Sequence, residues 1–344
     1  MRERGRSTAG RRAAVWALGA LFTLSATAGT LWALAGTIYS APAFVARYLE
    51  LVSSDSVTEA LRMPGVLPAA SDDPTSPSED EPSATLLRPG VISSGPSHIR
   101  IVEDRRNDDG SHTVTAEYEL AGSVQLAVYV VNPAPAAFGL VPNWAFRSSP
   151  LAELNVSVTS GTSFSVGGEI FDIRNASVAP SDGGPRVGRY LTLAPAVLQL
   201  SYSTEMVVAT ETPVVAASSA VVSTNLLVLP TPTLLERVQS KLDGFLADCA
   251  RQTVLQPTGC PFGSAVDDRV VGDPSWSLVS TPAVSLTPES GAFSMPRSPG
   301  LAHLSVPVER LYDGTQTTIE QDIEYTVSLV VSVLDDGSIA IQLR

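Results

Sequence analysis

The sequence is poor in the residues on which most metal and acyl-transfer sites depend. It contains two cysteines, three histidines and a single lysine, Lys241. The patterns His-Glu-x-x-His, Gly-x-Ser-x-Gly and Ser-x-x-Lys are all absent, and the last absence excludes a penicillin-recognising transpeptidase. We therefore predict no enzymatic activity, no catalytic residues, no cofactor and no metal ligands.

The few titratable residues that remain show no ligand spacing. We expect His98, His112 and His303 to be ordinary strand or loop residues, because none lies in a zinc-binding motif. Two acidic clusters lack the spacing of a calcium-binding EF-hand loop and are expected to be solvated. They comprise Asp267, Asp268 and Asp273, and Glu320, Asp322 and Glu324.

Positive charge is scarce outside the amino terminus. The chain carries a net charge of −13, yet its first 12 residues hold five arginines and one glutamate, a local charge of +4. The remaining 332 residues therefore sum to −17. Such a surface repels phosphate backbones, so the sequence predicts no nucleic-acid partner.

Residues 13–46 contain no charged side chain. About 20 apolar helical residues span a bilayer core, so we predict one transmembrane helix over residues 13–42, with the lipid bilayer as its partner. Trp16 and Tyr39 lie 23 positions apart, about 35 Å of helix, and are predicted to mark the two membrane boundaries. The arginines of residues 1–12 place the amino terminus in the cytoplasm and the rest of the chain outside it.

Two alternatives concern the same segment. Ala26-Thr27-Ala28 has the form of a signal-peptidase site, but the apolar run continues beyond it and exceeds the usual length of a cleaved segment, so we expect a retained anchor. Small residues recur at every fourth position and allow a weak homodimer through the membrane helix. They are Ser25, Gly29, Ala33 and Thr37.

The exported part divides into three predicted domains within a β-rich α+β fold. Residues 43–149 begin with two short helices, broken near residue 54, and continue through an acidic, proline-rich loop at residues 66–88 into antiparallel strands. Residues 150–229 show only short strands and predict a small β-sandwich-like domain. Residues 230–344 begin with an amphipathic helix and end in long strands, so they repeat the helix-then-sheet layout of the first domain.

The strands are read from alternation of apolar and polar residues. Apolar residues from Val114 to Leu120 share one face, and Val124, Leu126, Val128 and Val130 repeat the pattern after a turn. Alternation continues for 18 residues from Thr317 to Leu334, which exceeds the usual strand length and predicts a bend or bulge.

The layout of the first and last domains resembles NTF2-like and cystatin-like domains, in which a curved sheet wraps a helix. The run FVARYLELVSSDSVTEAL at residues 44–61 is similar to their entry helices. The run LLERVQSKLDGFLADCARQTVLQPTGCPFG at residues 234–263 resembles uncharacterised membrane-anchored envelope proteins of actinobacteria. This resemblance implies an envelope location and supplies no catalytic residues.

The two cysteines, Cys249 and Cys260, are predicted to form a disulfide. The predicted topology exposes both to a compartment where thiols oxidise, and the turn at residues 256–259 brings Cys260 back toward the helix that carries Cys249. A catalytic role for Cys260 lacks a neighbouring histidine in recognisable context. We expect a structural bond.

These features favour a non-catalytic, membrane-anchored binding or scaffold protein of the cell envelope. Its partner is expected to be an unidentified envelope protein, a peptide or a lipid. The alternative is an exported hydrolase whose catalytic set converges only in the folded chain. A pocket that holds a histidine or cysteine beside a carboxylate would favour this alternative.

The predicted topology is tested with reporters fused after residue 344. We expect a phosphatase that folds only outside the cytoplasm to be active there, and the same phosphatase fused after residue 12 to be inactive. A carboxyl-terminal reporter that works only in the cytoplasm would show that the predicted orientation is wrong.

Overall fold

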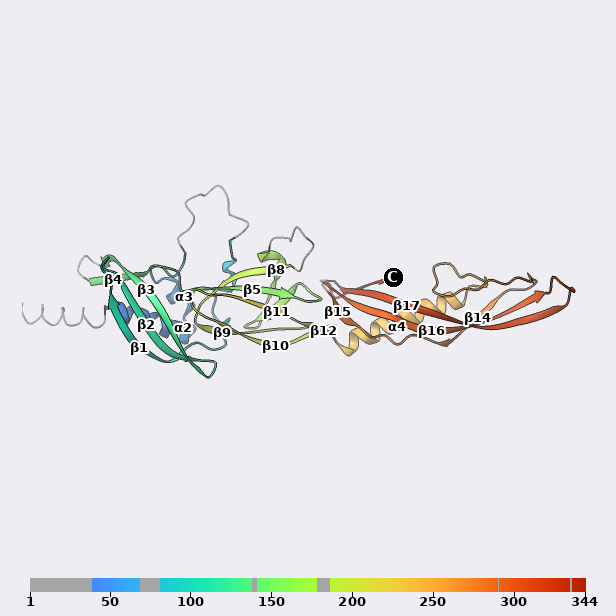
Figure 1. Cartoon of the computed structure of the whole chain (residues 1–344), viewed down its shortest axis with the longest axis horizontal. Coiled ribbons are helices and arrows are strands. Elements are labelled where there is room, and N and C mark those ends of the chain that lie inside the picture. Colours follow the sequence, from blue (N-terminus) through green and yellow to red (C-terminus); the bar gives the residue numbers. More distant parts are fainter. Residues whose placement is uncertain (1–38, 69–80, 138–140, 178–185, 290, 335) are drawn as a thin grey trace, which may run out of the picture.

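The computed structural model describes residues 39–68, 81–137, 141–177, 186–289, 291–334 and 336–344. Half of these residues lie in strands and 16% in helices, so the predicted β-rich character is confirmed. The elements follow one another along an elongated molecule, with α2 near one end and the carboxyl-terminal sheet at the other (Figure 1). No helix within the described ranges has the length and apolar composition needed to cross a membrane. Residues 13–38 of the predicted span lie outside those ranges.

The first helices form where the apolar spacing predicts them. Helix α2 (Ala41–Ser53) begins at Ser40, whose side chain accepts a hydrogen bond from the Ala43 backbone N–H at 3.3 Å. Helix α3 (Val57–Leu61) follows after a short break. Residues 41 and 42, which the sequence assigns to the membrane span, belong to α2 because Ser40 caps the helix one residue earlier.

The first sheet is an antiparallel meander against which α2 packs. Its order is β1 (Ser97–Arg106), β2 (His112–Leu120), β3 (Ser123–Ala137) and β4 (Val141–Phe146). Tyr48 of α2 is fully buried among these strands, and its hydroxyl donates to the Ala194 carbonyl at 2.6 Å. Burial raises the pKa of Tyr48 well above its usual range, so the hydroxyl remains a donor.

Strand β3 presents its apolar row to solvent. The two-residue turn at Ala121 and Gly122, both with positive φ, pairs Leu120 with Ser123 and so fixes the register. Val124, Leu126 and Val128 consequently lie on the outer face, 62–69% exposed, while Tyr129 and Val131 face the helix. The predicted alternation of apolar and polar residues is present in β3, but the register set by the turn places the apolar side chains of Val124, Leu126 and Val128 on the face away from the core.

The segment before β1 packs on the middle of the molecule. It contains a 3-10 turn, η1 (Ala84–Leu86). The backbone of Ser83 exchanges hydrogen bonds with Arg189 and Leu191, and Ser93 and Ser94 bond to Val197. Part of the loop predicted at residues 66–88 is therefore ordered against strands of the following sheets, while residues 69–80 lie outside the described ranges.

Two sheets form the middle of the chain. The first has the order β12–β10–β9–β6–β7 and the second β11–β5–β8, with β11 and β5 parallel. Their bounds are β5 (Ala152–Val158), β6 (Ser163–Val166), β7 (Glu169–Asp172), β8 (Val187–Thr192), β9 (Ala196–Ser203), β10 (Val207–Ala216), β11 (Val221–Leu226) and β12 (Val228–Pro230). A short 3-10 helix, η2 (Ile173–Ala176), follows β7.

The carboxyl-terminal sheet carries α4 (Pro232–Ala250), whose first turn is capped by the Thr231 side chain. The sheet is built around the pair β16 (Ala292–Glu309) and β17 (Gln316–Val333). Its other strands are β13 (Arg269–Val270), β14 (Ser275–Ser280), β15 (Thr287–Glu289) and β18 (Ile339–Leu343). A bend or bulge was expected in the strand from Thr317 to Leu334, which is β17. The bulge lies instead in its partner β16, which has one extra residue between Met295 and Ser298.

Candidate functional site

A groove runs between α4 and strand β18. It encloses about 550 Å³, a volume in the range of many small-molecule sites. Leu242, Leu246 and two further apolar residues of α4 are buried against the sheet, whereas Phe245 lies only partly buried on the groove side. The lining comprises Lys241, Leu242, Gly244, Phe245 and Asp248 of α4, Leu329 of β17, and Ile339, Ile341 and Leu343 of β18.

The groove is open because α4 does not fully cover the last strand. Ile339 and Ile341 are partly buried, and Leu343 is 50% exposed. A Cβ placed on Gly244, at the rim, would meet no other atom within 4 Å. The floor is therefore apolar and accessible from the edge of the sheet.

Strand β18 is also an edge strand. It pairs with β17 alone among the described strands. The backbone N–H of Leu334 donates to the Ser338 carbonyl at 2.8 Å, and that of Arg344 donates to the Ser328 carbonyl at 3.0 Å. Hydrogen-bonded pairs alternate along an antiparallel ladder. The backbone N–H and C=O groups of β18 that point away from β17 are therefore those of Ile339, Ile341 and Leu343.

The rim of the groove carries one uncompensated charge. Asp248 forms an ion pair with Arg251 one turn later on α4. Lys241 has no ion-pair partner within the described part of the chain. The only lysine of an acidic protein thus stands beside an apolar groove, available to an anionic group of a ligand.

The predicted disulfide fixes the end of α4 at this groove. Cys249 and Cys260 are bonded, with Cα atoms 5.8 Å apart, and Cys249 is buried in the last turn of the helix. Beyond the bond, Phe262 packs on Trp276 with ring centroids 5.1 Å apart. The Trp276 indole donates to the Val254 carbonyl at 2.8 Å. The cross-linked loop is thereby packed on the sheet and holds α4 across it.

His303 joins the second acidic cluster, a contact that the sequence analysis missed. Its Nδ1 lies 2.7 Å from Asp322 Oδ1 and its Nε2 lies 2.8 Å from Glu320 Oε2. Ser305 donates to the other Glu320 oxygen at 2.8 Å. The alternation of residues within each strand does not predict these contacts, because they depend on the register between β16 and β17.

This cluster does not contain the serine–histidine contact of a Ser-His-Asp triad. Among the described contacts, the Ser305 hydroxyl donates to Glu320, and His303 meets Glu320 and Asp322. The residues lie on an exposed strand face, and none of them lines the α4–β18 groove. No group of three or more potential ligands in the described residues is arranged to hold a metal ion.

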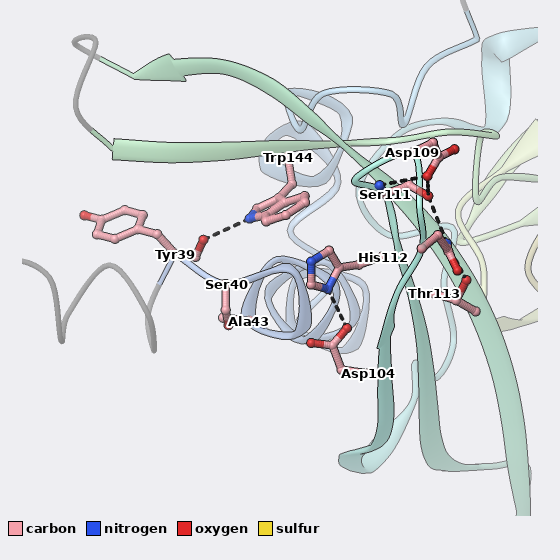
Figure 2. A network of polar contacts seen from close by, with 10 residues as sticks. Tyr39, Ser40, Ala43, Asp104, Asp109, Ser111, His112, Thr113 and Trp144 are labelled. Atoms are coloured by element: carbon pink, nitrogen blue, oxygen red, sulfur yellow. Dashed lines mark hydrogen bonds and ion pairs between the residues drawn. The ribbon is translucent and has the colours of Figure 1, made fainter.

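A second network links the predicted membrane boundary to the first sheet (Figure 2). The Trp144 indole donates to the Tyr39 carbonyl at 2.9 Å, and the His112 ring packs edge-on against the indole with centroids 4.9 Å apart. His112 Nδ1 lies 2.7 Å from Asp104 Oδ1. These contacts tie the chain at Tyr39, immediately before α2, to strands β1, β2 and β4.

The turn beside this network is held by a carboxylate. Asp109 accepts hydrogen bonds from the backbone N–H and hydroxyl of Ser111 and forms an ion pair with Arg147. The Ser111 hydrogen bonds, followed by Arg147, lower the pKa of Asp109 to about 2. The network is therefore a structural connection between the turn and the end of β4.

The other predicted residues are separate from these sites. Trp16 lies outside the described residues, as do Ser25, Gly29, Ala33 and Thr37. His98 is an exposed residue that pairs with Glu119 at 3.1 Å. The groove itself was not predicted, although the alternation at Ile339, Ile341 and Leu343 was a visible signal for its floor.

Comparison with protein-family models, curated proteins and solved structures gives no match.

Loss of the disulfide is expected to destabilise the domain. In the chain-entropy model, a loop of this size stabilises by roughly 2 to 3 kcal/mol. We expect Cys249→Ala/Cys260→Ala to lower the free energy of unfolding by about that amount in urea denaturation. Unreduced wild-type protein should show no thiol after unfolding, whereas two equivalents of reactive thiol would contradict the bond.

The His303 cluster is expected to make local stability dependent on pH. The His303 ring donates hydrogen bonds to Asp322 and to Glu320, and these bonds, that to Asp322 first, raise the pKa of His303 above its ordinary value. The stabilisation is therefore present below the unfolded pKa and is lost as pH rises through the raised folded pKa. NMR titration should give a pKa above about 6.5, with a decrease in Asp322→Asn. An unshifted His303 in the wild-type protein would contradict the cluster.

Proposed function

We propose that this chain is a non-catalytic, membrane-anchored, extracytoplasmic binding or scaffold protein of the cell envelope. The groove between α4 and β18 is the observation that carries the proposal. It combines an apolar floor, an accessible strand edge and one unpaired cation, which are features of recognition sites. The hydrolase alternative gains no support from this groove, because His303 and His112 meet their carboxylates outside it.

The sequence supports the proposed location. Residues 13–40 supply the proposed anchor, and the arginines before them set the proposed orientation. The Cys249–Cys260 bond supports an oxidising compartment, since stable disulfides are rare in the cytoplasm. In this orientation Tyr39 and the network around Trp144 lie next to the membrane surface.

We also propose that the helix-and-sheet units at the two ends are NTF2-like or cystatin-like domains. One amphipathic helix on a curved antiparallel sheet supports this assignment at both ends. In the carboxyl-terminal unit, a helix that leaves the last strand partly uncovered creates the groove. The same fold type hosts many functions, so the binding role is argued from the groove and not from the fold.

Photo-crosslinking in native membranes tests the binding role. A benzoylphenylalanine replacing Phe245, at the groove, should give a discrete adduct with an envelope component. The same photoreactive group at Arg297, an exposed residue of β16, is the matched control. Ile341→Lys, which places a charge on the floor, should remove the adduct. Equal labelling at both positions, or no adduct at residue 245, would contradict a binding role for this groove.

A further inference from the structure

We propose that the α4–β18 groove binds an extended peptide, which adds to the sheet as a strand beside β18. The peptide carries apolar side chains at alternate positions and a carboxylate that pairs with Lys241. This inference rests on the proposed function and specifies the ligand of the same site.

The backbone of β18 supplies the first part of the recognition. Ile339, Ile341 and Leu343 direct their N–H and C=O groups away from β17, and no described strand pairs with them. Strand addition satisfies such groups along the whole length of the edge. A lipid acyl chain has no donors or acceptors with which to use them.

Side chains supply the second part. Ile339, Ile341 and Leu343 point toward α4 and line the groove together with Phe245. An added strand places every second side chain on this same face, about 4.8 Å farther from β17. Large apolar side chains at those positions extend the floor and pack toward Phe245, which closes the open side of the groove.

Charge supplies the third part. Asp248 is already paired with Arg251, so Lys241 is the unpaired charge on the rim. A carboxylate of the peptide, terminal or side-chain, complements this cation. The chain as a whole carries a net charge of −13, which disfavours binding of the same carboxylate elsewhere.

A second copy of the chain fits the edge less well. Strand β17 runs along the long axis of the molecule, and β18 is antiparallel to it (Figure 1). Antiparallel pairing of two β18 strands would therefore turn one copy end for end. The two proposed anchors would then lie at opposite ends of the assembly, so two copies in one membrane could not stand side by side.

The test uses the full chain in lipid nanodiscs and a fluorescein-labelled hexapeptide that alternates threonine and leucine and has a free carboxyl terminus. We expect saturable binding by fluorescence anisotropy. Amidation of the carboxyl terminus, or Lys241→Gln, should weaken it about tenfold, the loss of one hydrogen bond between charged groups. The two changes together should weaken it no further, because they remove the same contact.

Strand pairing is tested by methylating backbone amides of the peptide. Methylation of one alternate set of amides should abolish binding, whereas methylation of the other set should leave it intact, because only one set faces β18. Ile341→Pro should also abolish binding, since it removes an outward N–H that the fold does not use, while Ile341→Val retains binding. Circular dichroism checks that both variants fold.

Three results would overturn the inference. Equal effects of the two methylation patterns would exclude strand addition. Displacement of the probe by oleate together with insensitivity to methylation would identify a lipid site. Concentration-dependent self-association that Ile341→Pro abolishes, without peptide binding, would identify a second copy as the occupant. An adduct at residue 245 in membranes would leave the proposed binding role standing in each case.

Discussion

The long ladder between β16 and β17 is the interaction on which the carboxyl-terminal half depends. Its two 18-residue strands form the platform for α4, whose apolar stripe from Leu234 to Leu246 is buried against it. Strand β18 attaches to the end of the same ladder. The position of the groove follows from this arrangement, because one helix covers only part of a sheet that continues beyond it.

The disulfide gives that arrangement its fixed geometry. A helix that contacts the sheet through one apolar stripe can tilt, and its end lies beside the groove. Cys249 ties the last turn to a loop that is itself packed through Phe262 and Trp276. The bond therefore stabilises the fold and also limits movement of the helix residues that form the rim.

Periodicity allowed much of the fold to be predicted, because helices and strands with one buried face carry a repeating apolar pattern. Helix α4 and strand β17 were anticipated in this way. Strand β3 shows that periodicity alone does not predict which face of a strand is buried. Its alternation is as regular as that of β17, but a two-residue turn fixes its register and directs Val124, Leu126 and Val128 outward. The contacts of His303 and the packing of residues 83–94 depend on pairing between distant segments, which local pattern does not encode.

The edges of the sheets differ in a way that bears on function. Exposed edges invite unwanted pairing, and proteins usually protect them with charged residues. Strand β1 follows this rule, since residues 103–106 are all charged. Strand β18 has no charged residue between Ile339 and Leu343, and its apolar side chains line a groove. An unprotected strand edge beside an accessible apolar groove lowers solubility unless a ligand occupies it. The contrast between the charged edge of β1 and the uncharged edge of β18 therefore favours β18 as a binding surface for a partner strand.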